Sequence, residues 1–490
     1  KDIVKTLSIN KYANHNVTLK KNILEDSFQT FKSRFDSKLG GFTGSRNKFP
    51  KPHDFSFLAR YFYKTKDHSA LNIIEKSLYE MKKGGIYDQI GYGFHRYSTD
   101  EKWLVPHFEK MLYDQALIIH AYLDAYVLTN NNFYAQTVKE VCEYISRDMT
   151  DQDGGFYSAE DADTKGEEGL FYIWKSSELK NLLTNEEYLF IADLLNISEN
   201  GNSSVEGHRT NIPHFTMSWS EIEKKYNLTY DELLDKYNLI RNKIYLEREN
   251  RVHPQKDDKI LTDWNGLMIS ALARAGVILN DEKYLIAAKN SADFILENLM
   301  DEDGGLLKRY RDSESGIPGM IEDYAFFIWG LIELYQADFE SKYLEEAVRL
   351  SEYQKKHFWD NQNKGFYFTS DKTESLIVRN KEIYDGAIPS GNSVSAYNFI
   401  RLGRIISKVE YEELAYELVN SFAPQLNRYG SGSTMLLHAI NFMEGPSFEV
   451  IVRGEYSQIS KIISEIHISK QFNKVIIFDR DNSKLFDYIS

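Results

Sequence analysis

A glycine-centred turn recurs between stretches of helical periodicity along this 490-residue chain. In each copy, one or two glycines precede an aromatic or apolar residue, which is typical of a helix end followed by a short strand or hairpin. A repeated helical hairpin cannot bury its apolar face alone, so the repeats must stack on one another or close into a ring. The copies are Leu39-Gly40-Gly41-Phe42, Gly84-Gly85-Ile86-Tyr87, Asp153-Gly154-Gly155-Phe156, Asp303-Gly304-Gly305-Leu306 and Lys364-Gly365-Phe366-Tyr367.

Apolar residues at helical spacing predict about twelve helices in six pairs, and several links between neighbours are only a few residues long. Such neighbours pack antiparallel, and six antiparallel pairs can close into an (α/α)6 toroid. An open solenoid is the alternative, but the uneven repeat and the long interruption at about 157–255 favour the closed ring. The predicted fold is mainly α, an (α/α)6 toroid with a small C-terminal α/β appendage. The predicted helices span residues 20–35, 53–65, 67–82, 107–128, 131–148, 262–279, 281–299, 321–337, 340–357, 390–407, 409–423 and 433–443.

Two regions depart from the helical repeat. Residues 1–445 form the expected barrel, and its insertion at about 157–255 carries helical segments that we expect to cover the barrel mouth. Residues 446–490 change character, because Phe448–Val452 and Lys474–Phe478 have the composition of buried strands on either side of a helix. This βαβ unit is too small to fold alone, so we expect it to dock on the barrel.

The second helix of each predicted pair begins with small polar or acidic residues. Alternate helices of such a barrel form its inner ring, so these starts converge at one end with their free N–H groups and positive dipole ends. Ser, Thr and Asp are also ordinary helix caps, so the coincidence of six starts is what predicts a pocket. The starts are Pro52-His53-Asp54, Pro106-His107, Thr262-Asp263-Trp264-Asn265, Glu322-Asp323-Tyr324, Ser390-Gly391-Asn392-Ser393 and Ser431-Gly432-Ser433-Thr434.

The stretch from Trp103 to Ala116 contains the central candidate site. Because proline is tolerated in a first helical turn, Pro106 predicts a helix start. His107 and Asp114 then share one flank of this helix. A buried helix that begins with His and carries Asp two turns later is a candidate site, with helix capping by His107 as the alternative.

Charge and cysteine content exclude several classes of function. The net charge of −14, without a basic stripe, argues against a nucleic-acid partner and against an anionic membrane surface. No apolar run is long enough to span a membrane, and no signal-peptide core is found. The single cysteine, Cys142, permits neither an internal disulfide nor a Cys-based zinc site, which fits a cytoplasmic protein. The acidic stretch 158–169 fails as an EF-hand because Lys165 and Tyr172 occupy ligand positions, so we predict no metal and no cofactor.

Carboxylates, histidines and aromatic residues gather where loops meet the inner helix starts. Aromatic faces and carboxylates suit a small polar ligand of the sugar class. We expect His107 to transfer a proton with Asp114 as its orienting partner, as in a sugar epimerase or isomerase. Asp263 and Asp323 would share the acid–base work. A glycoside hydrolase that uses a carboxylate pair, and a non-catalytic ligand- or protein-binding module, are the alternatives. The expected substrate-binding residues are His95, Trp103, Glu160, Asp161, Asp163, Asp257, Asp258, Trp264, Asn265, Glu322, Tyr324, Asp385, Ser390 and Asn392.

Several long motifs across nearly the whole chain resemble one known family. The motifs are Gly84–Gly91, Gly93–Ser98, Trp103–Gln115, Ser158–Asp163, Asp257–Lys259, Trp264–Leu267, Glu322–Ala325, Asp385–Ala387 and Pro389–Ser393. They resemble the YyaL / spermatogenesis-associated thioredoxin-domain-containing family. The resemblance implies a six-hairpin-glycosidase-like toroid, akin to N-acylglucosamine 2-epimerases and cellobiose epimerases. Family members usually begin with a thioredoxin-like domain, which is absent from this chain and is therefore an expected partner. Tyr92 departs from the family's three glycines and is expected to narrow that loop.

Overall fold

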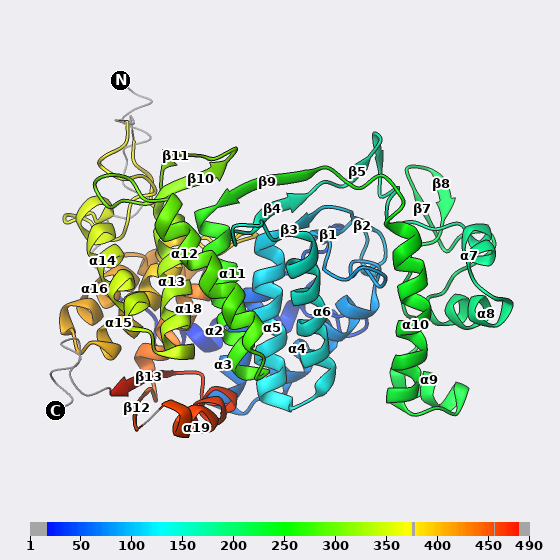
Figure 1. Cartoon of the computed structure of the whole chain (residues 1–490). Helices are drawn as coiled ribbons and strands as arrows, with labels where there is room; N and C mark the ends of the chain where they lie inside the picture. The colour runs from blue at the N-terminus through cyan, green and yellow to red at the C-terminus, as the bar shows by residue number, and fades with distance from the viewer. Residues whose placement is uncertain (1–16, 375–377, 455, 480–490) are drawn as a thin grey trace, which may run out of the picture.

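Six helices form a closed inner ring in the computed structural model, which describes residues 17–374, 378–454 and 456–479 (Figure 1). Each inner helix packs against the next, and the last packs against the first, so an open solenoid is excluded. The predicted (α/α)6 toroid is confirmed. The inner helices are α3 (Pro52–Thr65), α5 (Leu112–Thr129), α11 (Thr262–Ile278), α13 (Ile321–Asp338), α15 (Gly391–Ile405) and α18 (Thr434–Glu444). The outermost parts of the two predicted domains, residues 1–16 and 480–490, lie outside the described residues.

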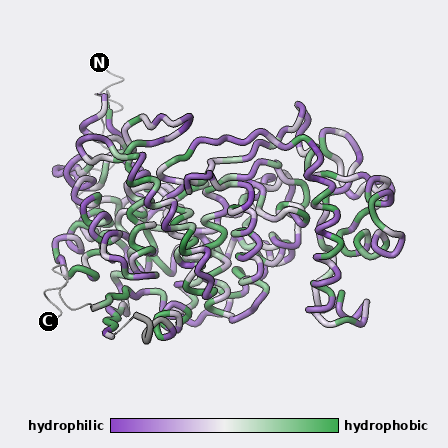
Figure 2. Tube along the Cα trace, viewed as in Figure 1, coloured by the Kyte–Doolittle hydropathy of each residue, from purple (hydrophilic) through white to green (hydrophobic). Residues whose placement is uncertain are grey.

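An outer layer of amphipathic helices surrounds this ring. In α14, for example, Tyr343, Leu344, Ala347 and Leu350 are buried at helical spacing, whereas charged residues occupy the opposite face. Figure 2 shows hydrophobic and hydrophilic residues alternating along the helices at the front of the molecule. The outer helices are α2 (Ile23–Arg34), α4 (His68–Lys83), α6 (Asn132–Asp148), α12 (Glu282–Asn298), α14 (Ser341–Phe358) and α16 (Val409–Ser421), followed by the short α17 (Ala423–Tyr429) and η1 (Gly430–Gly432).

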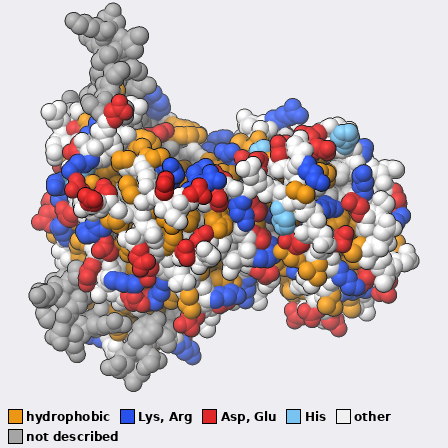
Figure 3. Space-filling view, turned by 45° about the horizontal axis from the view of Figure 1, so that its top comes forward, with side chains coloured by type: hydrophobic (Ala, Val, Ile, Leu, Met, Phe, Trp, Pro, Cys, Tyr) orange, Lys and Arg blue, Asp and Glu red, His pale blue; other side chains and the backbone are white. Residues whose placement is uncertain are grey.

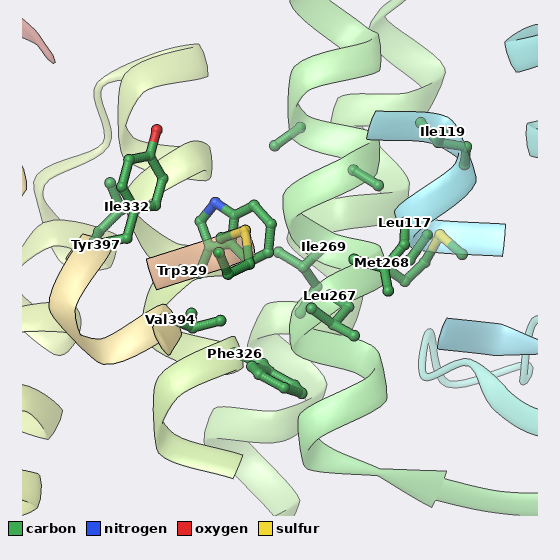
Figure 4. Packing of buried hydrophobic residues seen from close by; sticks show 14 of the residues in the cluster. Leu117, Ile119, Leu267, Met268, Ile269, Phe326, Trp329, Ile332, Val394 and Tyr397 are labelled. Atoms are coloured by element: carbon green, nitrogen blue, oxygen red, sulfur yellow. The ribbon is translucent and has the colours of Figure 1, made fainter. Parts of the chain in front are cut away.

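The inner helices are apolar around most of their circumference because neighbours enclose them. Every residue of α13 except Glu322 is buried, since α11, α12, α14 and α15 pack around this helix. Trp329 of α13 lies between Ile269 of α11 and Tyr397 of α15 in this core (Figure 4). None of the described helices combines the length and the hydropathy that crossing a bilayer requires.

Helix α5 begins at Leu112, so the predicted start at Pro106 is wrong. Residues 106–111 instead form two short strands, β2 (Pro106–His107) and β3 (Lys110–Met111). Strand β2 pairs with β1 (Tyr97–Ser98), and β3 pairs with β4 (Tyr157–Glu160). Proline is compatible with an extended segment as well as with a first helical turn, and these strand partners supply the backbone hydrogen bonds.

A five-stranded sheet crosses the end of the barrel where the inner helices begin, which we call the mouth (Figure 1). Its strands lead directly into α5 and α11 and, through a short link, into α13, so the sheet fixes where these helices start. The strand order is β11 (Glu314–Pro318), β10 (Leu307–Arg311), β9 (Lys256–Leu261), β4 and β3. Two further hairpins are β5 (Asp163–Thr164) with β6 (Glu167–Glu168), and β7 (Ser203–Val205) with β8 (His208–Thr210).

The insertion forms a side lobe next to α4 and α6, so the prediction that it covers the mouth is wrong (Figure 1). Its helices are α7 (Ser176–Leu182), α8 (Asn185–Leu194), α9 (Trp219–Tyr226) and α10 (Tyr230–Arg248). Helix α10 attaches the lobe to the loop after α4. Tyr237 Oη donates to the Gln89 carbonyl at 2.6 Å, and Arg248 forms a buried ion pair with Asp88 at 2.9 Å. These polar anchors hold the lobe at the side of the barrel.

The C-terminal unit lies at the end of the ring opposite the mouth (Figure 1). Strands β12 (Phe448–Arg453) and β13 (Lys474–Asp479) are parallel and flank α19 (Tyr456–Ile468), as expected for the α/β appendage. Strand β13 packs against α13 and α15, and the backbone N–H of Ile476 donates to Gln336 Oε1 at 2.9 Å. The prediction that both strands are buried is wrong for β12, because Phe448 and Ile451 are each 47% exposed on its outer side.

Candidate functional site

The carboxyl groups of Asp263 and Asp323 meet at the starts of α11 and α13. The backbone N–H of Asp263 donates to Asp323 Oδ1 at 3.1 Å. Lys308, from β10, places its Nζ 2.6 Å from Asp263 Oδ2 and 3.2 Å from Asp323 Oδ1. Both carboxyl groups are buried, and burial together with the neighbouring Asp263 carboxylate raises the pKa of Asp323. The mouth therefore holds an acidic pair that shares one cation.

Glu322 stands beside this pair in the first turn of α13. Its side chain is half-buried, and Oε1 accepts a long hydrogen bond from the backbone N–H of Gly391 at 3.4 Å. Burial and the Asp263 carboxylate raise the pKa of Glu322 to about 7. A carboxyl group with such a pKa retains a proton near neutral pH and can donate it, which is the requirement for a general acid.

Asp114 lies in the first turn of α5, the neighbour of α11 in the ring. Burial raises the pKa of Asp114, while the Arg96 guanidinium acts in the opposite direction. Among the described residues, Asp114 Oδ2 has no hydrogen-bond partner although it is buried. The adjacent ring of Tyr113 meets Trp264 edge to face, with ring centroids 4.8 Å apart, so the first turns of α5 and α11 lie side by side. Asp114 thus adds another buried acid to the mouth.

His107 does not pair with Asp114, and that predicted partnership is wrong. The strand conformation of β2 directs His107 toward Glu168 of β6, with Nδ1 2.7 Å from Oε1, and toward Glu109, with Nε2 3.4 Å from Oε2. The imidazole also stacks on Tyr97, with ring centroids 5.1 Å apart. His107 is therefore a half-buried histidine between two glutamates rather than a residue at a helix start.

Two more carboxyl groups join the remaining inner helix starts. Asp385 accepts hydrogen bonds from the backbone N–H groups of Ser390 at 2.9 Å and Met435 at 2.7 Å, which tie α15 to α18. Asp54, in the first turn of α3, accepts from Thr434 Oγ1 at 3.1 Å. Burial raises the pKa of both Asp54 and Asp385 to about 7. Ser390, which we predict to bind substrate, caps α15 with its side chain.

Asn265 and Asn392, which we predict to bind substrate, hold the glycine-centred turns against the inner helices. Asn265 Oδ1 accepts from the Phe156 backbone N–H at 2.8 Å, and its Nδ2 donates to the Phe156 carbonyl at 3.0 Å. Both amide side chains are buried, and these hydrogen bonds to the backbone satisfy their polar atoms. In three places a side-chain amide bonds to both the N–H and the carbonyl of one backbone residue: Asn265 to Phe156, Asn392 to Phe366, and Gln115 to Phe94.

Four further expected residues are buried and committed to contacts within the protein, so their side chains do not join the acidic cluster at the mouth. Burial lowers the pKa of His95 to about 3, which keeps this imidazole neutral. The four contacts are His95 Nδ1 with the Phe108 carbonyl at 3.0 Å, Trp103 Nε1 to the Leu39 carbonyl at 2.9 Å, Tyr144 Oη to Glu160 Oε2 at 2.8 Å, and the Leu306 N–H to Tyr324 Oη at 2.8 Å.

The acidic residues expected from the insertion and from β9 have other surroundings in the structure. Asp161 and Asp163 are exposed at the β5 hairpin, on the side of the lobe (Figure 1). Asp257 pairs with Lys259 at 2.9 Å, and Asp258 pairs with Arg311 at 2.7 Å. The structure therefore brings together Asp114, Asp263, Trp264, Glu322 and Asp323 out of the predicted set.

Sequence reasoning missed the charged partners of these acids. Lys308 lies on β10, a strand that the helical periodicity does not predict. The signal that could have indicated it is the pair of acidic helix starts, because two neighbouring buried carboxylates need a nearby positive charge. The other missed residues at this end are Arg96, Glu109, Tyr113 and Glu168. Figure 3 shows Lys, Arg, Asp and Glu side chains interspersed with hydrophobic ones across the face that is tilted toward the viewer. Among the described residues, no cluster of three or more His, Cys, Asp or Glu is arranged to hold a metal ion.

Comparison with known proteins places the chain among longer relatives. No family model matches the chain. It is 33% identical over 487 residues to spermatogenesis-associated protein 20 of Rattus norvegicus, an alignment that covers 92% of this chain and 62% of the relative. The predicted family resemblance is confirmed. The chain thus spans about three fifths of the length of this relative.

Solved structures share the toroid fold at low sequence identity. The GH76 α-mannanase of Bacteroides thetaiotaomicron matches with a TM-score of 0.51 and 12% identity, over 89% of this chain and 98% of that chain. An unsaturated glucuronyl hydrolase of Bacillus sp. GL1 matches with a TM-score of 0.50 and 11% identity, over 86% of this chain and 94% of that chain. The fold is therefore one that carbohydrate-active enzymes also adopt.

Proposed function

We propose that the mouth binds a saccharide and cleaves a glycosidic bond, with Glu322 as the general acid. The observation that carries this proposal is the contrast between Glu322, whose pKa is raised to about 7, and the neighbouring Asp263, which pairs with Lys308. Neighbouring carboxyl groups in different environments can divide acid and base roles between them. Asp263 is the proposed carboxylate partner, with Asp323 sharing its cation.

Aromatic surface at the mouth supports a sugar as the ligand. Trp264 is half-buried beside Asp263, and Tyr384 is 48% exposed in the loop that precedes α15. An aromatic ring offers a flat apolar face while its polar tip stays hydrated, which suits the C–H face of a pyranose. The solved structures with this fold include a mannanase and a glucuronyl hydrolase, and their names support the same ligand class.

The test is glycoside turnover by matched variants. Purified protein is assayed for released reducing ends on a panel of manno-, gluco- and glucuronic-acid-containing oligosaccharides. Because a general acid contributes about 10²–10⁴-fold, Glu322→Gln should lower kcat/KM by at least about a hundredfold. Asp161→Asn removes an exposed carboxylate far from the cluster and should leave turnover unchanged. If Glu322→Gln retains wild-type turnover on a cleaved substrate, the assignment of the acid is wrong.

Sugar epimerisation or isomerisation is the second candidate, and the environment of His107 favours it. The imidazole lies between Glu168 and Glu109 and is half-buried, so it can exchange a proton with a bound ligand. Incubation with free sugars in deuterated water distinguishes the two reactions. Deuterium at a sugar carbon that disappears in His107→Asn indicates epimerisation or isomerisation, whereas new reducing ends without exchange indicate hydrolysis.

If neither reaction occurs, the proposed function is that of a binding module that works with a thioredoxin-like domain. Sugars would then stabilise the protein thermally without being converted, and Glu322→Gln would change the affinity alone. The proposed location is the cytoplasm, since the single cysteine, Cys142, is buried and free.

A further inference from the structure

A cavity of about 60 Å³ lies at the end of the barrel opposite the mouth, between the inner ring and the C-terminal unit. Because a single water needs roughly 10–15 Å³ on this scale, the cavity has room for several waters or one small polyatomic ion. Side chains from α3, α5, α11, α13 and α15 form its walls, and residues from α19 to β13 close it. Its polar lining includes Arg60, Arg274, Glu333, Gln336, Tyr397, Arg401, His467, Ser469, Gln471 and Lys474.

The charges around this cavity do not balance among the described residues. Arg60, Arg274, Arg401 and Lys474 line it, whereas Glu333 is the one carboxylate in the lining and Asp124 lies behind two of the arginines. Neighbouring histidines do not add charge, because burial lowers the pKa of His467 to about 4 and that of His120 to about 3. When Lys474 is protonated, four cations therefore face two carboxylates in a partly enclosed space, which is costly without further anionic charge.

Among the described residues, some N–H groups of the arginines around the cavity have no hydrogen-bond acceptor. Arg60 pairs with Asp124 at 3.1 Å, and Arg401 pairs with Glu333 at 2.8 Å. Among the described residues, the buried Nε atoms of both Arg60 and Arg401 have no hydrogen-bond partner. These side chains are 8% and 3% exposed, so bulk water does not satisfy them. The guanidinium groups around the cavity therefore have more donors than acceptors, and a ligand that brings acceptors would offset this deficit.

Lys474 extends the cationic wall from the side of the C-terminal unit. Its Nζ donates to Ser469 Oγ at 2.9 Å. Burial and the nearby Arg274 lower the pKa of Lys474 to about 7. An anion placed in the cavity would stabilise the charged form of this amine. His467 and Gln336 join the two sides, since His467 Nε2 lies 2.9 Å from the Gln336 carbonyl.

We propose that this cavity is a binding site for a small dianionic oxyanion of the phosphate class, which bridges the barrel and its C-terminal unit. Arginine guanidinium groups match the geometry of phosphate oxygens, and an oxyanion supplies several acceptors at once. With Lys474 protonated, a dianion also cancels the two excess positive charges of the wall. The site is separate from the mouth, because the cavity lies at the opposite ends of the inner helices.

The test is anion binding by the purified chain at constant ionic strength. Inorganic phosphate, methyl phosphate and sulfate are each titrated against sodium chloride, with calorimetry and thermal unfolding as readouts. Wild-type protein should show a saturable heat with phosphate and a rise in Tm that chloride does not produce. Methyl phosphate distinguishes a phosphate group on a larger molecule from free phosphate. Tighter binding of methyl phosphate than of inorganic phosphate indicates the former source.

Matched variants locate the binding. Lys474→Met removes one charge and keeps the aliphatic stem, and Arg274→Gln removes another, so each should weaken phosphate binding about tenfold or more. Arg349→Gln changes an exposed arginine on α14 and should bind as the wild type does. Unchanged affinity in Lys474→Met and Arg274→Gln, or no saturable binding to wild type, would overturn the proposal.

A further readout does not depend on folding of the variants. In wild-type protein, phosphate should slow hydrogen exchange in the peptides that contain β13 and α19 and leave the mouth strands unchanged. Exchange that is the same with phosphate and with chloride also overturns the proposal.

Discussion

The backbone N–H of Asp263 donates to Asp323 Oδ1 at 3.1 Å, so a carboxylate from one inner helix caps the start of the next. Because α11 and α13 are neighbours in the ring, this bond fixes the spacing of two acidic side chains at the mouth. Lys308 then contacts both carboxylates from a strand that precedes α13. The contact that joins these two helices thus also places Asp263, the proposed carboxylate partner of Glu322.

Lys308→Met should destabilise the protein by about 2 kcal/mol at pH 8. Removing one partner of a largely buried ion pair leaves the other charge uncompensated. The expected loss of stability is smaller than for a fully buried ion pair, because the Lys308 side chain is 25% exposed. The loss should shrink at pH 5, because burial raises the pKa of Asp323, and a protonated acid needs no cation.

Urea denaturation at the two pH values measures this effect. Lys283→Met is the control, because Lys283 pairs with Asp281 at 3.0 Å but its side chain is 68% exposed. This control should change stability by less than about 0.5 kcal/mol. An equal loss for both variants at pH 8 would contradict a buried role for Lys308.

Glu322→Gln should change the dependence of stability on pH. The pKa of Glu322 is raised to about 7 in the folded protein. As the pH rises from about 4 to about 7, the unfolded chain releases a proton that the folded chain retains, so this group lowers the free energy of unfolding. The glutamine variant lacks this loss and should gain about 1–3 kcal/mol relative to wild type over that range, with no further change above it.

Denaturation curves from pH 4.5 to 8 test the prediction. Glu302→Gln is the matched control, because Glu302 is exposed at a turn, and its stability should follow the wild-type curve. Parallel curves for wild type and Glu322→Gln would show that the carboxyl group of Glu322 ionises as an exposed glutamate does.

Helix pairing was predictable because its signals are local. The glycine turns and the apolar spacing mark where each helix ends and which face is buried, and the inner helix at Thr262–Ile278 starts at the predicted residue. The conformation of residues 106–111 was not predictable, because Pro106 suits both a helix start and a strand. The deciding factor is pairing of β3 with β4, which lies far along the chain and leaves no local pattern.

The acidic centre was predictable only in part. Asp263, Glu322 and Asp323 follow from the rule that alternate helices begin at one end of the ring. Lys308 could not be placed because it lies on a strand whose neighbours come from distant segments. The role of Asn265 is ambiguous in the sequence, because an amide at a helix start can contact either a ligand or the backbone, and only the fold shows that both of its polar atoms bond to Phe156.

Asn265→Ala should destabilise the protein without altering ligand chemistry. The change leaves the buried N–H and carbonyl of Phe156 without their partner, and each such group costs about 1–3 kcal/mol. We expect a loss of about 2–4 kcal/mol in urea denaturation and an unchanged pH profile of turnover. Asn298→Ala, on an outer helix, removes one bond to the Phe294 carbonyl and should cost less than about 1 kcal/mol. A shifted pH profile in Asn265→Ala would mean that this amide acts on the ligand.

Gly266→Ala should separate α11 from α13 and thereby weaken the fold and the proposed centre together. A Cβ at Gly266 would lie 2.5 Å from the backbone carbonyl carbon of Phe326 and from the backbone nitrogen of Phe327, and backbone atoms cannot rotate away. Alanine inside a helix is otherwise favoured over glycine by about 1 kcal/mol. We therefore attribute the expected net loss of about 2–3 kcal/mol to the steric clash.

The control for this last substitution is Gly316→Ala on β11, where an added Cβ meets no atom within 4 Å. Its stability should stay within about 0.5 kcal/mol of wild type. Because the Asp263–Asp323 bond spans the same two helices, Gly266→Ala should also reduce turnover, whereas Gly316→Ala should not. Full stability and activity in Gly266→Ala would show that the ring tolerates a wider gap between α11 and α13 than this packing implies.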